Sequence, residues 1–105
     1  MADYLQVLTT TDRRAEAERL ARAAVEARLA ACAQVTGPVA STYWWDGAVD
    51  SAEEWQVWFK TAADRYDALA GFLREQHSYE VPEIIATEIV AGSPDYLGWV
   101  REQTR

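Results

Sequence analysis

The N-terminal third of the chain changes from a strand pattern to a helical one. Tyr4 to Thr10 is short and rich in apolar residues and threonine, which is typical of a β-strand. A helix is predicted to begin near Asp12, where the side chain of Thr11 or Asp12 can cap its free N–H groups. The apolar residues that follow recur at the spacing of one helix face: Ala17, Leu20, Ala21, Ala24, Val25 and Leu29.

The middle of the chain has the pattern of a β-hairpin. Cys32 to Trp45 is strand-like, and Gly37-Pro38 predicts a bend, a bulge or an edge position, because proline has no N–H to donate to a neighbouring strand. Asp46-Gly47 between two apolar runs predicts the turn. The returning strand is predicted from about Glu53 to Thr61. Alternation gives it one face with Trp55, Val57 and Phe59 and another with Gln56, Trp58 and Lys60.

The C-terminal half adds three further elements. The pattern predicts, in order, a helix from about Ala63 to Gln76, a connector from His77 to Pro82, a strand from Glu83 to Val90 and a short helix from Ser93 through Val100. Gly71 should weaken its helix by about 1 kcal/mol relative to alanine, and a close approach between helix and sheet would explain it. The order β-α-β-β-α-β with an extra C-terminal helix predicts one α+β domain over residues 1–105, with a ferredoxin-like antiparallel sheet and helices on one face.

Large aromatic side chains are concentrated in the predicted hairpin. They are Tyr43, Trp44, Trp45, Trp55, Trp58 and Phe59. Alternation places them on both faces of the sheet, whereas the helices can cover only one face. A single copy would therefore expose a large apolar patch, and we expect self-association through the open sheet face or through the hairpin. The alternative is that the C-terminal helix covers the patch.

Charge and cysteine content narrow the function classes. Seventeen acidic residues against ten basic ones give the 105-residue chain a net charge of -7. This excess disfavours nucleic acids and anionic membranes as partners, because both need a basic surface. A single cysteine excludes an internal disulfide, and no apolar run is long enough for a transmembrane helix. The first residues lack the features of a signal peptide, so we expect a cytoplasmic protein.

Four residues carry the candidate chemistry. Lys60, the only lysine, lies on a predicted strand with apolar neighbours, so it is either paired with an acid or placed to contact an anion. His77, the only histidine, follows a helix, where it can cap the helix or bind copper or zinc. Cys32 is either a small apolar core residue or a thiolate ligand. Glu83 begins an isoleucine-rich strand, where its carboxylate needs a partner, and Lys60 is the predicted one.

Four stretches of the chain have a recognisable order and spacing: Leu29 to Val35, Ser41 to Gly47, His77 to Ile85 and Gly92 to Val100. Together they resemble the CutA divalent-cation tolerance family over nearly the whole chain. The resemblance implies a fold similar to that of PII signalling proteins and a homotrimer whose sheets pack around a central axis, with the hairpin embracing a neighbour. It also implies a response to divalent metal ions, copper above all, by a protein that is not an enzyme.

The chain departs from that family at two places. Thr11-Asp12 stands where many relatives have Cys-Pro, and Ser78 follows His77 where proline is common. The first departure removes a soft ligand, and the oxygen of Asp12 is a weaker ligand for a soft ion, so we expect lower affinity for copper.

The function expected from residues and resemblance together is that of a non-enzymatic homotrimer in divalent metal ion tolerance. We expect it to bind copper, ahead of zinc, weakly at a cleft between subunits, with the metal ligands Cys32, His77 and Glu83. The residues expected to line the cleft are Lys60, Tyr79 and Trp44. The alternative is a PII-like regulatory module that binds a small anionic ligand between subunits. No P-loop, HExxH or Ser/His/Asp pattern is present, so neither catalysis nor an organic cofactor is expected.

Overall fold

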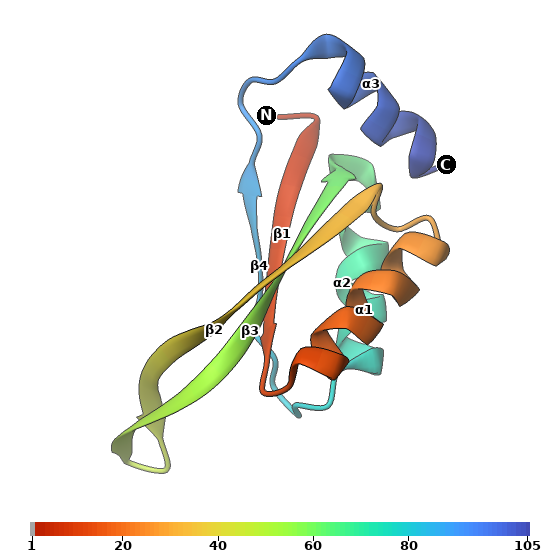
Figure 1. The fold of residues 1–105 in the computed structure, drawn as a ribbon. Helices are drawn as coiled ribbons and strands as arrows, with labels where there is room; N and C mark the ends of the chain where they lie inside the picture. The colour runs from red at the N-terminus through yellow and green to blue at the C-terminus, as the bar shows by residue number, and fades with distance from the viewer. Residues whose placement is uncertain (1) are drawn as a thin grey trace.

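The computed structural model describes residues 2–105 as one antiparallel sheet with three α-helices (Figure 1). Its elements are β1 (Tyr4–Thr11), α1 (Arg14–Glu26), β2 (Cys32–Trp45), β3 (Ala48–Ala62), the 3-10 turn η1 (Ala63–Arg65), α2 (Tyr66–Gln76), β4 (Ile84–Glu88) and α3 (Pro94–Gln103). The strand order is β2-β3-β1-β4. This confirms the predicted α+β, ferredoxin-like fold with an additional C-terminal helix. No helix of the described residues is long and apolar enough to cross a membrane.

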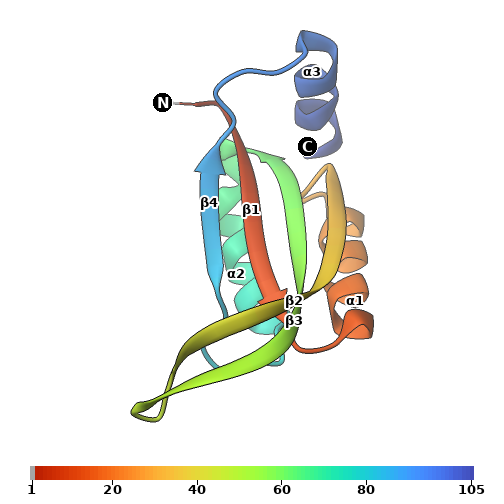
Figure 2. The same ribbon diagram turned by 60° about the vertical axis from the view of Figure 1, so that its left-hand side comes forward.

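Helices α1 and α2 lie on the same face of the sheet and bury the core against it (Figure 2). Leu20 of α1 and Leu69 of α2 are fully buried there, together with Val57 and Phe59 of β3. The predicted alternation of β3 is confirmed, because Trp55 also packs against this core. The intervening residues of β3 therefore lie on the opposite face of the sheet.

The start and end of α1 differ from the prediction. Its N-cap residue is Arg13, and no side chain caps the helix, so the predicted cap by Thr11 or Asp12 is wrong. The physical reason is that Thr11 is the last residue of β1 and its side chain is fully buried. The helix ends before Leu29, whose N–H nevertheless donates to the Ala24 carbonyl at 3.0 Å and whose side chain stays in the core.

The C-terminal elements begin largely as predicted. Ser93 is the N-cap residue of α3 and Pro94 its first residue, although the Ser93 hydroxyl makes no capping hydrogen bond. Helix α3 continues past the predicted end, and β4 is shorter than predicted at both ends. Gly71 does not mark a close approach between α2 and the sheet. A Cβ there would meet the Arg74 guanidinium at 3.9 Å as its nearest neighbour.

Strand β2 bends where the sequence predicted an interruption. Its pairing with β3 shifts between Thr36 and Val39, which is a bulge at Gly37-Pro38. Gly37 has a φ of +146°, and a Cβ there would lie 2.8 Å from Cδ1 of Trp55. Only glycine fits this position, because both the backbone conformation and the neighbouring indole exclude a side chain.

The hairpin of β2 and β3 extends beyond the body of the molecule (Figure 1). Its turn is at Asp46 and Gly47, whose φ angles of 50° and 78° suit a two-residue hairpin turn. Strand β3 begins directly after the turn, at Ala48, so the hairpin is longer than predicted. Trp44 and Trp45 at the tip are 75% and 69% exposed.

Helix α3 leaves this hairpin tip uncovered. It is fixed at the opposite end of the sheet, where Val100 is buried and Arg105 forms an ion pair with Asp64 of η1 at 2.8 Å. The alternative in which the C-terminal helix covers the aromatic patch is therefore wrong. An aromatic surface remains exposed in a single copy.

We call the face without α1 and α2 the open face (Figure 2). One row across its four strands holds, in register, Cys32, Lys60, Gln6 and Thr87, and the next row holds Gln34, Trp58, Leu8 and Ile85. Polar side chains fill the first row, and the aromatic ring of the second, Trp58, is half-buried. The exposed aromatic surface thus lies mainly at the hairpin tip rather than on the open face.

Candidate functional site

His77 connects the end of α2 to β1. It is the C-cap residue of the helix and only 9% exposed. Its Nε2 lies 2.8 Å from the Thr10 carbonyl oxygen, and its Nδ1 accepts the N–H of Tyr79 at 2.9 Å. Because Nδ1 is the acceptor, Nε2 is the nitrogen that donates, to the Thr10 carbonyl. Both ring nitrogens are occupied, so a metal could bind at Nδ1 only after the Tyr79 N–H is displaced.

Tyr79 joins the same corner to the hairpin. Its ring lies 4.8 Å from the His77 ring, and its hydroxyl donates to Oε2 of Glu54, in β3, at 2.8 Å. Burial, followed by this hydrogen bond, raises the pKa of Tyr79 well above its ordinary value. The phenol therefore stays protonated and acts as a donor. The connector after α2 is held by side chains at two points.

Lys60 and Glu83 are not partners. The ammonium of Lys60 donates to Oε1 of Gln34, on the neighbouring strand β2. Glu83 is exposed and directly precedes β4, whose first residue pairs with Thr9 of β1, whereas Lys60 pairs with Gln6. Within one chain the predicted ion pair is wrong, because the sheet register places the two side chains at different positions along the strands.

Cys32 lies at the far end of the sheet from His77. It faces Lys60, which faces Gln6 of β1, whereas His77 contacts Thr10 of that strand. Four residues along a strand correspond to about 13 Å. Within one chain, the structure therefore separates these two predicted metal ligands. Among residues 2–105, no three His, Cys, Asp or Glu side chains form a group that could hold a metal ion.

The half-buried thiol of Cys32 has a partner on α3. Its Sγ lies 3.3 Å from the hydroxyl of Tyr96. This hydrogen bond, with burial as the second cause, raises the pKa of Tyr96 to about 12. The contact ties the first half of α3 to the edge of the sheet.

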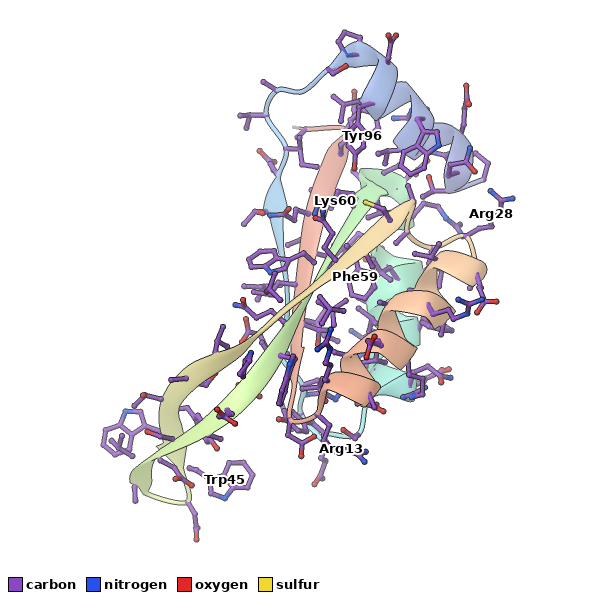
Figure 3. The ribbon with its side chains drawn as sticks, viewed as in Figure 1. Arg13, Arg28, Trp45, Phe59, Lys60 and Tyr96 are labelled. Carbon is purple, nitrogen blue, oxygen red and sulfur yellow. The ribbon has the colours of Figure 1, made fainter. Side chains whose placement is uncertain are left out.

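The three predicted cleft residues also lie apart in one chain. Trp44 is at the hairpin tip next to Trp45, and Lys60 is near the opposite end of the sheet, below Tyr96 (Figure 3). Tyr79 contacts β3 between them, at Glu54. A cleft that includes all three would require more than one copy of the chain.

Sequence reasoning missed the partners of these residues: Gln34, Glu54 and Tyr96. Gln34 carried a signal, since it lies two residues after Cys32 and so shares its face of β2. The contacts of Glu54 and Tyr96 join segments that are 25 and 64 residues apart, for which the sequence pattern gives no signal.

The chain resembles proteins of one family along nearly its full length. A family model described as "CutA1 divalent ion tolerance protein" matches residues 5–103. The divalent-cation tolerance protein CutA of Pectobacterium atrosepticum is 33% identical over 105 residues, which is 100% of this chain and 96% of that protein. The rice protein CutA 1, chloroplastic, is 35% identical over 99 residues, 94% of this chain but 56% of the rice protein. The chain thus spans little more than half of that plant relative.

Solved structures agree with these sequence matches. The structure of CutA from Xylella fastidiosa has a TM-score of 0.96 and 33% identity, covering 99% of this chain and 100% of that one. The periplasmic divalent cation tolerance protein CutA from Archaeoglobus fulgidus has a TM-score of 0.94 and 30% identity, covering 97% and 99%.

Proposed function

Because the chain belongs to the CutA1 divalent ion tolerance family, we propose that it acts in divalent metal ion tolerance, copper above all. In this proposal the active form is a homotrimer that binds the metal weakly at a cleft between subunits and catalyses no reaction. The proteins named for divalent-cation tolerance include relatives that match this chain end to end, which supports the functional class.

One observation carries the proposed assembly. Trp44 and Trp45 are 75% and 69% exposed at the tip of a hairpin that extends beyond the body of the chain, and Val49 beside them is 59% exposed. A soluble protein seldom leaves such a patch in water, and a second copy of the chain is the simplest partner. A homotrimer would bring the hairpin of one copy to another copy.

The geometry of the predicted ligands supports the proposal of weak metal binding. Cys32 and His77 lie at opposite ends of the sheet, so a single chain offers no preformed site with soft ligands. His77 would have to give up its hydrogen bond from Tyr79, whereas the carboxylate of Glu83 is exposed and free to move. A site made of ligands from two copies, with Glu83 among them, would favour weak rather than tight metal binding.

We further propose a cytoplasmic location. The printed names of relatives include a chloroplastic protein and a periplasmic one. Fractionation of cells that express the native gene tests this point. Recovery of the protein outside the cytoplasm would refute it.

The assembly is tested by sedimentation. The wild type should sediment at three times the 11.8 kDa chain mass, and Trp44→Ser should shift it towards the monomer. Val90→Ser is the matched control, because Val90 is 88% exposed but lies in the loop before α3. A wild type that sediments as a folded monomer at micromolar concentration overturns the proposal.

Metal binding is tested by calorimetric titration with Cu²⁺ and Zn²⁺. The wild type should show weak heats, larger for Cu²⁺, and Glu83→Gln and Cys32→Ser should each reduce them. His77→Ala separates a ligand from a structural residue, since a purely structural role leaves the heat per folded protein unchanged. Wild-type heats in all three variants would exclude these residues as the metal site.

A second candidate function is supported by Lys60. Its ammonium contacts the amide of Gln34 rather than a carboxylate. An unneutralised ammonium on the open face suits the alternative, a PII-like regulatory module that binds a small anionic ligand between subunits. A small-metabolite panel in the same calorimeter tests it, and silence of the whole panel would argue against it.

A further inference from the structure

Helix α1 ends in a turn at which an arginine takes the usual place of glycine. The N–H of Leu29 donates to the Ala24 carbonyl and that of Arg28 to the Val25 carbonyl, both at 3.0 Å, which is the hydrogen-bond pattern of a Schellman motif. Arg28 has a φ of +63°, a left-handed conformation that this motif usually gives to glycine. A side chain at such a position points to a use for its guanidinium.

Arg28 lies between the end of α1 and α3 (Figure 3). Its Nη1 donates to the side-chain oxygen of Gln103 at 2.9 Å and lies 3.4 Å from the Gln103 backbone oxygen. Among residues 2–105, no carboxylate pairs with Arg28, and no group accepts a hydrogen bond from its Nε or Nη2. These two nitrogens form the edge of a guanidinium that binds a carboxylate through two parallel hydrogen bonds. The contact with Gln103 thus positions the guanidinium and leaves this edge free.

A pocket of about 270 Å³ lies beside this guanidinium, between the end of α1 and α3. Its apolar wall includes Val25, Ala30 and the indole of Trp99, which is 40% exposed. Arg28 and Glu26 add one charge of each sign. Pockets for drug-sized ligands measure roughly 300–1,000 Å³, so this one suits a small metabolite.

The pocket is on the helix side of the sheet. Ala30 belongs to the core beneath α1 and α2, and Val25 packs against that core. The N–H of Ala31, also in the wall, donates to the Lys60 carbonyl at 2.9 Å, which places the pocket at the end of the sheet away from His77. Neither the open face nor the hairpin tip contributes to its walls, so self-association through those surfaces does not use them.

The two charges of the pocket together select a zwitterion. The carboxylate of Glu26 lies 3.4 Å from Nε of Arg22 and is largely exposed, two residues before Arg28. The C-terminus of α1 also favours a positive group, because the helix dipole is negative there. A ligand with a carboxylate and an ammonium on one carbon matches both charges. A simple anion would instead meet Glu26, and a simple cation would meet Arg28.

We propose that this pocket binds a free α-amino acid with an aromatic or large aliphatic side chain. The carboxylate of the ligand binds the free edge of Arg28, its ammonium binds Glu26, and its side chain packs on Trp99. This inference goes beyond metal tolerance and depends neither on the proposed metal ligands nor on the open face.

The probe is L-phenylalanine, titrated into the native assembly with its five tryptophans replaced by 5-fluorotryptophan. Fluorine NMR then reports on each indole, and Trp99→Phe and Trp44→Phe identify two of the resonances by their loss. Phenylalanine should shift the Trp99 resonance in a saturable manner and leave that of Trp44, at the hairpin tip, unchanged. An unshifted Trp99 resonance overturns the site, whether or not other resonances move.

Three analogues test the ligand class in the same titration. Phenylpropionate lacks the ammonium, phenylethylamine lacks the carboxylate, and free glycine lacks the apolar side chain. Because both charges of the pocket are exposed, each single-charge analogue should bind about three- to fivefold more weakly than phenylalanine, and free glycine about tenfold more weakly. Equal binding of either single-charge analogue overturns the zwitterion, and equal binding of free glycine overturns the apolar wall.

Two substitutions of Arg28 separate binding from folding. Arg28→Gly relieves the left-handed φ, so it should keep its stability in urea and yet weaken phenylalanine binding about fivefold or more. Arg28→Gln should weaken binding to a similar extent. Its matched control, Arg14→Gln, removes the same charge at the first residue of α1 and should change affinity by no more than about twofold. Full affinity in both Arg28 variants overturns the role of the guanidinium.

Glu26→Gln tests the contact with the ammonium. It should weaken phenylalanine binding about three- to fivefold and should not weaken phenylpropionate binding. The matched control is Glu18→Gln, which removes the acid of the corresponding pair with Arg14 and should alter neither affinity. Equal effects of Glu26→Gln on the two ligands would refute the ammonium contact.

Discussion

The geometry at His77 predicts a structural role that can be measured directly. Replacing His77 by alanine removes the N–H that the Thr10 carbonyl accepts and the Nδ1 atom that accepts the Tyr79 N–H. Thr10 is only 7% exposed, so its carbonyl would lose its partner in a largely dry environment. A buried polar group without a partner costs about 1–3 kcal/mol, and a second lost bond adds about 1 kcal/mol. We therefore expect His77→Ala to lower the free energy of unfolding by about 2–4 kcal/mol.

Two further substitutions divide this loss between the ring nitrogens. Asparagine places an acceptor near the position of Nδ1, and glutamine places a donor near that of Nε2. His77→Asn and His77→Gln should each lose about 1–2 kcal/mol, less than His77→Ala. Urea unfolding at one fixed protein concentration measures all four proteins, because stability of an assembly depends on concentration. The reasoning is refuted if His77→Ala unfolds within about 0.5 kcal/mol of the wild type.

Three other predictions concern single contacts. Tyr79→Phe deletes the hydroxyl that donates to β3 and should lower the free energy of unfolding by about 1 kcal/mol in urea, whereas Tyr66→Phe should stay within about 0.5 kcal/mol. The hydrogen bond from Arg19 holds the pKa of Glu16 below its ordinary 4.5, so this carboxylate stabilises the fold above pH 4.5 and loses its contribution as pH falls through its folded-state pKa. Arg19→Met should therefore make the melting temperature fall less steeply as the pH is lowered. An unchanged pH dependence of the melting temperature would contradict this reasoning. Gly37→Ala forces a positive φ and a 2.8 Å contact, and we expect a loss of about 2–4 kcal/mol by urea unfolding; a neutral effect would show that the bend relaxes freely.

The hairpin illustrates how far the sequence pattern reaches. Asp46-Gly47 fixes the pairing near the tip, where Trp45 faces Ala48. Extended without interruption, that register would pair Cys32 with Thr61, which is fully buried on the core side. The bulge shifts the pairing by one residue, and Cys32 faces Lys60 on the open face instead. A one-residue shift changes the face of every following side chain, so an interruption recognised in the sequence still left the site undetermined.

The termini of elements were harder to predict than their existence, for a comparable reason. Thr11 has the chemistry of a helix cap, but pairing with Trp55 extends β1 through it and buries it. Long-range pairing overrides a local preference that is worth about 1 kcal/mol. The same competition explains why β3 continues to the turn, where the sequence from Ala48 to Ala52 has no strong strand preference of its own.

The two ends of the sheet have different chemical roles. At one end, the hydrogen bonds of His77 and Tyr79 are all used internally, so these side chains stabilise the fold and are costly to recruit for a ligand. At the other end, the half-buried Lys60 ammonium makes one side-chain hydrogen bond, to Gln34, so a contact to its other N–H groups breaks no bond of the fold. A ligand that binds without disturbing the fold should therefore be sought at the Lys60 end. A metal held by Nδ1 of His77 should instead bind weakly, because part of its binding free energy is spent on displacing the Tyr79 N–H.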